Sequence, residues 1–230
     1  MNVFVSVPGR RRPRIRWVTP LIVALSMAGF VWLATMNPDV QAAFLLRWGA
    51  VPRSLFSPAL LSDALLDGRA FSLVSALFLH VNWLHLLGNL LFLLIFGLPA
   101  ERSLGPLRFL VLFVFCGVAA NLSAAWSLDG TGAVIIGSSG AVSGLIGAFL
   151  VLFPRAQLAI VLPLGLFLEF VRTPASVLIG IWALLQLMFA YVGPTFGAVA
   201  WWAHLAGFAL GMLLAIPMRR GVARQLRRNR

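Results

Sequence analysis

The sequence predicts an all-α membrane protein, a bundle of six transmembrane helices with a long amphipathic first loop. Its 230 residues are 61% hydrophobic and 10% charged, and the mean hydropathy is +0.97. Soluble domains carry about a quarter charged residues, so a water-soluble globule of this length would expose too much apolar surface. Six apolar stretches also come close to the roughly 20 residues that a helix needs to cross the hydrocarbon core.

The first apolar stretch, at about residues 17–36, follows a run of arginines, as the apolar part of a signal peptide does. It is long enough to span the bilayer and no clear small-residue cleavage site follows it, so we expect a retained helix. Residues 37–70 hold six charged residues and are too polar to span. Residues 70–100 would measure about 45 Å as one helix, which is too long for a perpendicular span. We therefore assign their first part to an outer loop over 37–81.

The other five apolar stretches follow at regular distances. The expected helices cover about residues 82–100, 106–128, 139–154, 174–192 and 198–217. This gives a membrane domain over 17–217, which contains the outer loop, between two basic cytoplasmic tails at 1–16 and 218–230.

All eighteen basic residues are arginine, and most lie near the two ends of the chain, which has a net charge of +12. They mark helix ends instead of lining one surface, so no nucleic-acid partner is expected. With both termini cytoplasmic, fifteen arginines fall inside and three outside, in agreement with the positive-inside rule. The exclusive use of arginine suggests a GC-rich bacterial source, and so an integral protein of the bacterial inner (cytoplasmic) membrane.

Four polar residues share one depth in this topology. Polar side chains are costly in lipid, so each needs a reason. The helices at 82–100, 139–154 and 198–217 all run inwards from the outer side. His85, Asn89, Ser139 and His204 then lie within about 10 Å of the outer edge of the hydrocarbon core. Residues that only join neighbouring helices need not share a layer, so a common depth favours a site.

Small residues recur at helical spacing after both Ser139 and His204. Ser139 stands in the run Gly137-Ser138-Ser139-Gly140, and His204 is followed by Gly207 and Gly211. Such stripes let helices pack with their backbones close together, which would bring the Ser139 hydroxyl to His204. Without the serine and the histidine, these stripes would be ordinary packing.

The chemistry of these residues predicts a serine nucleophile and a histidine base. A serine hydroxyl attacks only when a neighbouring base takes its proton, and imidazole titrates near neutral pH. Ser139 also opens a helix, where free N–H groups favour a developing oxyanion, and the side chains of His85 and Asn89 can donate to the same oxygen. The alternatives are that Ser139 is only a helix cap, or that Ser138 is the nucleophile.

No acid is placed to complete a triad, so we predict a Ser–His dyad. Five of the six acids fall in the first loop or on the inner side, and nothing in the spacing puts Asp129 behind His204. His80 and His85 are five residues apart and lack the glutamate of a His-Glu-x-x-His zinc motif. Neither a metal nor a cofactor is expected.

At this point the chain resembles the rhomboid family of intramembrane serine proteases, from about Arg69 to Leu214. The resemblance is carried by three groups of residues: Phe78-Leu79-His80 with His85, Asn89, Gly97, Glu101 and Gly105; the Gly-x-Ser-Gly motif at 137–140; and Ala203-His204-Leu205-Ala206-Gly207 with Gly211. The family often has Trp-Arg in its first loop, where this chain has Phe71-Ser72. The anchoring arginine of that loop is lost, or Arg69 replaces it.

The resemblance implies a six-helix fold with a water-filled cavity open to the outside. It implies a serine endopeptidase that cleaves transmembrane protein substrates near helix-breaking, small-residue segments. In that case Ser139 is the nucleophile and His204 the base. His85, Asn89, Gly137 and the Ser139 backbone N–H lie around the oxyanion or substrate, while His80 anchors a loop beside the site. Gly140, Gly207 and Gly211 support it.

Two other functions compete with proteolysis. A catalytically silent rhomboid-like protein would bind membrane clients, but such proteins usually lack the serine or the histidine, and both are present here. A transporter or channel would need polar residues along a full path, yet the inner halves of the helices at 82–100, 139–154 and 198–217 are almost wholly apolar. The expected partners are therefore transmembrane substrates and the lipid bilayer, and no oligomeric state is predicted.

Overall fold

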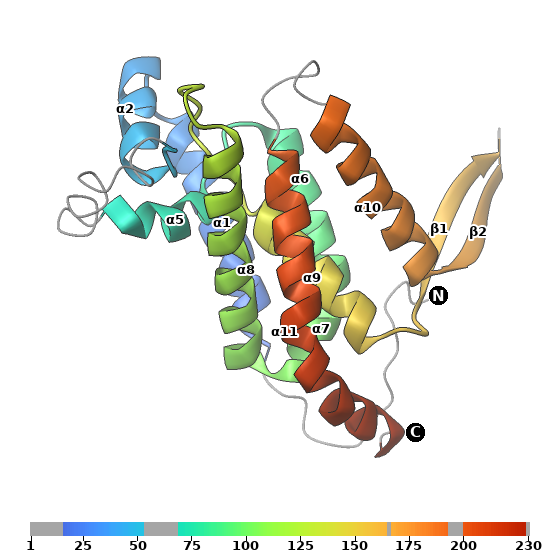
Figure 1. Ribbon diagram of the computed structural model, residues 1–230. Coiled ribbons are helices and arrows are strands. Elements are labelled where there is room, and N and C mark those ends of the chain that lie inside the picture. Colours follow the sequence, from blue (N-terminus) through green and yellow to red (C-terminus); the bar gives the residue numbers. More distant parts are fainter. Residues whose placement is uncertain (1–15, 53–68, 165–166, 193–199, 229–230) are drawn as a thin grey trace.

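A computed structural model describes residues 16–52, 69–164, 167–192 and 200–228 (Figure 1). Each of the six apolar stretches contains a helix within these residues. The helices are α1 (Val18–Ala34), the continuous run of α6 (Trp83–Phe92), η3 (Leu93–Gly97) and α7 (Leu98–Leu104), α8 (Pro106–Ser127), α9 (Ser139–Leu152), α10 (Ala175–Val192) and α11 (Trp201–Arg228). The described part of the chain is mostly helical, as predicted.

Four helical segments are long and apolar enough to cross a membrane: Trp83–Leu104, Pro106–Ser127, Ala175–Val192 and Trp201–Arg227. α1 and α9 are apolar but shorter, with 17 and 14 residues. At 1.5 Å per residue α9 is about 21 Å long, less than a hydrocarbon core of about 30 Å. At least one end of α9 therefore lies below a membrane surface, and Figure 1 shows α9 starting lower than the upper ends of α8 and α11.

α9 is the central helix of the bundle. Eleven of its 14 residues are buried, among them Leu145, Ile146 and Phe149. It packs against α11, α8 and the α6–η3–α7 run. A helix that is apolar on every side is stable when other helices surround it, which explains why the shortest of the six lies in the middle.

A buried carboxylate fixes the start of α1. Glu101, in α7, has no exposed surface. Its Oε1 accepts the Val18 N–H at 2.9 Å, and its Oε2 accepts the Thr19 N–H at 3.0 Å and the Thr19 hydroxyl at 2.6 Å. The first N–H groups of a helix have no acceptor within the helix, and a negative charge there is favourable. Glu101 thus anchors α1 to the end of α7.

The predicted first loop contains several short helices. α2 (Pro38–Trp48) begins at Asn37, whose side chain accepts the Val40 N–H. η1 (Arg69–Phe71), α5 (Ser72–Ser75) and η2 (Ala76–Phe78) then lead to α6. At the Phe71-Ser72 position Phe71 is exposed and Ser72 is buried. Residues 53–68 of the loop lie outside the described part of the chain.

The chain is not wholly helical, which corrects the all-α prediction at one place. β1 (Gln157–Leu164) and β2 (Phe167–Pro174) pair antiparallel, with Gln157 opposite Pro174. The hairpin projects to one side of the bundle, beside the start of α10 (Figure 1). β-branched and aromatic residues make up half of β2, and β1 contains Ile160 and Val161. These residue types favour extended backbone.

α11 continues beyond the point where the sixth helix was expected to end. A proline inside a helix removes one backbone hydrogen bond, which is why Pro217 predicts an end there. In the structure Pro217 lies inside α11, which runs to Arg228. Val222 is buried and Leu226 packs against the core, so the two turns after Pro217 are stabilised by apolar contacts.

We expect Glu101→Gln to lower the free energy of unfolding by about 1–3 kcal/mol. The amide keeps the size of the side chain but replaces one acceptor oxygen with a donor, which leaves an N–H or hydroxyl of Val18 or Thr19 unpaired. Thermal unfolding in detergent measures the change. Asp39→Asn, an exposed carboxylate in the first turn of α2, is the control and should change stability little. Equal stability of the Glu101 variant and the parent would contradict the anchoring role.

Candidate active site

Ser139 is the first residue of α9, and a tight turn leads into it. Ser138 is the N-cap, and Gly137 before it has φ 105°, a backbone conformation that residues with a side chain rarely adopt. A Cβ atom on Gly137 would also lie 3.0 Å from Nε2 of His85. Glycine is thus required at this position for two reasons: the turn needs a positive φ, and the imidazole of His85 leaves no room for a side chain.

α9 and α11 meet backbone to backbone beside Ser139. A Cβ atom on Gly207 would collide with the Gly140 carbonyl oxygen, and one on Gly211 with the carbonyl oxygen of Gly144. On the other helix, a Cβ atom on Gly140 would lie 3.7 Å from the carbonyl oxygen of Ala203. Gly140, Gly207 and Gly211 therefore lie at the contact between the two helices, and their support of the site stays a prediction.

This contact brings the residues next to Ser139 and His204 together. Gly140 follows Ser139, and Ala203 precedes His204. Within the described residues the Ser139 hydroxyl has no hydrogen bond to His204, so the pairing of the two stays a prediction supported by helix packing. Catalytic hydrogen bonds are often long in a resting site and shorten with substrate.

The two neighbouring serines differ in exposure. Ser138 is 1% exposed, and among the described atoms its hydroxyl has no hydrogen-bond partner. Ser139 is partly exposed. Of these two serines, Ser139 is therefore the one with more exposed surface.

His80 links three parts of the site through one ring nitrogen. The ring is fully buried. Its Nε2 accepts the Ser138 backbone N–H at 3.4 Å and the side-chain amide of Asn89 at 3.0 Å. Both partners are donors, so Nε2 is the unprotonated nitrogen of a neutral imidazole. His80, between η2 and α6, thereby holds the start of α9 next to α6.

His85 and Asn89 lie one turn apart on α6. The ring of His85 is exposed, and its centroid lies 5.3 Å from that of His80. Asn89 is buried, and one of its two amide hydrogens is used by His80. The structure thus gathers His80, His85 and Asn89 beside the start of α9. The proposed contact of His85 and Asn89 with an oxyanion stays a prediction, and so does the loop-anchoring role of His80.

His204 has a partner that the sequence analysis missed. Its Nδ1 lies 2.7 Å from Oε1 of Gln186, in α10. The centroids of the His204 and Trp201 rings lie 6.0 Å apart, with the ring planes nearly perpendicular. The available signal was a single amide side chain within the apolar run 175–192, which is costly in lipid unless it has a partner.

Carboxylates and metals do not complete the site in the described part of the chain. Asp129 is exposed, and its side chain accepts the N–H of Gly130. No group of three or more His, Cys, Asp or Glu side chains in this part is close enough together to hold a metal ion.

The fold and these positions define a helical integral membrane protein with a serine and a histidine on two closely packed helices. The chain matches the Rhomboid domain over residues 67–221, and it belongs to the rhomboid family. Rhomboid-like protein 11, chloroplastic, of Arabidopsis thaliana is 34% identical over 63% of this chain and 51% of its own length.

Two bacterial relatives extend the comparison. Putative rhomboid protease YdcA of Bacillus subtilis is 34% identical over 36% of this chain and 42% of its own length. Uncharacterized protein Mb1372 of Mycobacterium bovis is 30% identical over 94% of this chain and 82% of its own length. The chain thus spans about half the length of the plant relative and less than half of the Bacillus protein.

We expect the stability of the fold to fall in mild acid because of His80, which lies outside the membrane-spanning helices. Burial, and next to it the neighbouring His85, lowers the pKa of His80 to about 4, against about 6.5 in an unfolded chain. The unfolded chain therefore binds the proton more readily. The stabilisation is complete above pH 6.5 and is lost as the pH falls towards 4.

The loss amounts to about 2 kcal/mol by pH 5. Thermal unfolding of the parent and of His80→Gln, measured in detergent at pH 7, 6 and 5, separates this residue from the other histidines. The amide oxygen of glutamine can accept the Ser138 N–H at each pH, so the variant should lose less stability than the parent. If the parent and His80→Gln lose the same stability between pH 7 and 5, protonation of His80 does not cause the loss.

Proposed function

We propose that this protein is an intramembrane serine endopeptidase that cleaves transmembrane segments of other proteins with a Ser139–His204 dyad. The observation that carries the proposal is the position of Ser139, at the start of the buried α9 and beside the glycine contact with the helix of His204. Membership of the rhomboid family and the name of the Bacillus relative, a putative rhomboid protease, support the same reaction.

In the first step the Ser139 Oγ attacks the carbonyl carbon of the scissile peptide while Nε2 of His204 takes the hydroxyl proton. The protonated His204 then gives that proton to the leaving amine, which frees the carboxyl-side half of the substrate. A water molecule hydrolyses the acyl-enzyme in the reverse order of proton transfers, and this step restores the Ser139 hydroxyl.

The negative oxygen of the tetrahedral intermediate needs donors that are in place before the reaction. The N–H of Ser139 belongs to the first turn of α9, where N–H groups have no acceptor within the helix. The imidazole of His85 packs on Gly137 one residue before the N-cap, and Asn89 has a second amide hydrogen beside its bond to His80. We assign these three groups, with Gly137, to the oxyanion and substrate site.

The depth of Ser139 defines the class of substrate. A 14-residue α9 cannot reach both membrane surfaces. We place its first residue below the outer surface, because α9 starts lower than the upper ends of α8 and α11 (Figure 1). A peptide bond at that depth belongs to a transmembrane segment. Within a regular helix its backbone is fully hydrogen-bonded, so cleavage favours segments with small or helix-breaking residues that can extend into the site.

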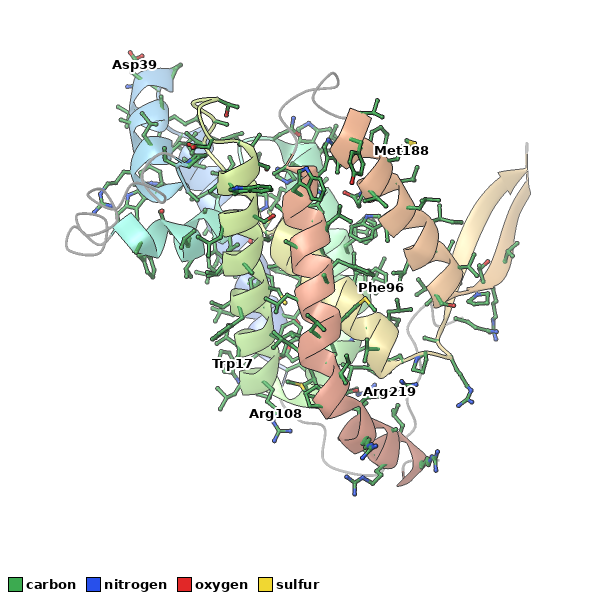
Figure 2. All side chains as sticks on the ribbon, viewed as in Figure 1. Trp17, Asp39, Phe96, Arg108, Met188 and Arg219 are labelled. Atoms are coloured by element: carbon green, nitrogen blue, oxygen red, sulfur yellow. The ribbon has the colours of Figure 1, made fainter. Side chains whose placement is uncertain are left out.

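The distribution of arginine supports an orientation with both termini in the cytoplasm. Arg108 and Arg219 lie towards one end of the bundle, and Asp39 lies at the other (Figure 2). Fifteen of the eighteen arginines belong to the end of Arg108 and Arg219 in the proposed topology, which includes the basic segments 1–16 and 218–230. We propose the bacterial cytoplasmic membrane as the location and the outer side as the side of the site.

The test is cleavage of a transmembrane substrate by the purified protein in detergent. Ser139→Ala and His204→Ala should each lower kcat by about 10³-fold or more, because neither residue of a dyad works alone. Ser138→Ala should keep most of the activity, since its hydroxyl is buried. Unfolding temperatures near that of the parent show that the variants are folded.

Three outcomes would contradict this function. Activity that survives in Ser139→Ala and disappears in Ser138→Ala would move the nucleophile to the rival serine. Activity in His204→Ala would remove the base. A folded parent that binds transmembrane segments and cuts none of a panel with small-residue interruptions would favour a client-binding protein.

A further inference from the structure

We propose that Gln186 is a positioning residue for the reaction, holding His204 in the tautomer and ring orientation that a base for Ser139 requires. This inference deepens the proposed function and rests on it. It starts from the 2.7 Å contact between Oε1 of Gln186 and Nδ1 of His204, which joins α10 to α11.

Gln186 is a buried amide on a helix whose outer face is apolar. α10 exposes apolar side chains on its outer face, such as Leu184 and Leu187, whereas Gln186 is only 8% exposed. Burial of an amide costs free energy unless the amide has a hydrogen-bond partner. Leucine or methionine would fill this place at no such cost, so the glutamine is explained by its bond to His204.

The bond selects one of the two neutral forms of the imidazole. An amide oxygen can only accept a hydrogen bond, so Nδ1 of His204 carries the hydrogen. Nε2 then keeps its lone pair, which is the atom that takes the proton of the Ser139 hydroxyl in the proposed mechanism. When Nε2 becomes protonated, the Nδ1–H bond to Gln186 remains, so the amide is suited to both states of the base.

A second, indirect connection runs from α10 to the same ring through Trp201, the first residue of α11. Trp201 packs edge-on against His204, and Phe189 stacks on Trp201 with ring centroids 4.9 Å apart. Gln186 and Phe189 are three residues apart and therefore on one face of α10. α10 is thus connected to the His204 ring directly through Gln186 and indirectly through Phe189 and Trp201.

A pair of substitutions separates positioning from packing. Gln186→Met keeps the length and nearly the volume of the side chain but removes the acceptor oxygen. Gln186→Glu keeps an acceptor at the same reach. Leu185→Met, on the lipid-facing side of the same helix, is the matched control. The measurements are kcat and KM on a transmembrane substrate, and the ¹⁵N shifts of the imidazole nitrogens in histidine-labelled protein, with His204→Ala to assign the signals.

We expect Gln186→Met to lower kcat by about tenfold with little change in KM, the effect of one hydrogen bond lost at the base. Its His204 signals should move from the Nδ1–H form towards a mixture of the two tautomers. Gln186→Glu should restore kcat to within about threefold of the parent, and Leu185→Met should behave as the parent.

Three results would overturn the inference. One is a Gln186→Met protein with the kcat and the tautomer of the parent. Another is an equal loss of kcat in the Met and Glu variants, which would indicate packing alone. The third is a Gln186→Met protein in which kcat falls while the His204 tautomer stays that of the parent. If the parent cleaves nothing, the proposed function fails, while a tautomer change in Gln186→Met would still support the positioning contact.

Discussion

The contact between α9 and α11 is the constraint on which the rest of the arrangement depends. Its closeness comes from Gly207 and Gly211 of α11, because a Cβ atom at either place would collide with the carbonyl oxygen of Gly140 or Gly144 on α9. Gly140 and Gly144 in turn leave room for α8, since a Cβ atom on them would collide with Ala120 or Cys116. In lipid no hydrophobic force draws helices together, so van der Waals contact between backbones is a main source of their association. Here the same contact also sets Ser139 beside the helix of His204.

Three buried polar side chains of the bundle each have a hydrogen-bond partner on another element. Glu101 accepts donors at the start of α1, His80 accepts from the start of α9, and Gln186 accepts from His204. In a medium without water such bonds are the available compensation for a buried polar atom. They also tie helices together at the depths where a site needs fixed geometry.

The sequence was sufficient for the helices, because they depend on local signals, whereas the roles of the candidate site residues stay predictions. Apolar runs indicated the six helices, and the spacing of small residues after Ser139 and His204 indicated the contact between α9 and α11. The continuation of α11 past Pro217 was not predicted, since it depends on the apolar contacts of Val222 and Leu226. The hairpin at 157–174 was not predicted either. The role of Gln186 was not predicted because only the fold shows that Gln186 lies next to His204.

The central claim is that His204 activates Ser139 and no other serine. Reaction of the folded protein in detergent with a fluorophosphonate, followed by mass spectrometry of the peptides, tests it without any choice of substrate. We expect a single modified serine, Ser139, and at least tenfold slower modification in His204→Ala. Modification of Ser138 instead, or an equal rate in the histidine variant, would contradict it.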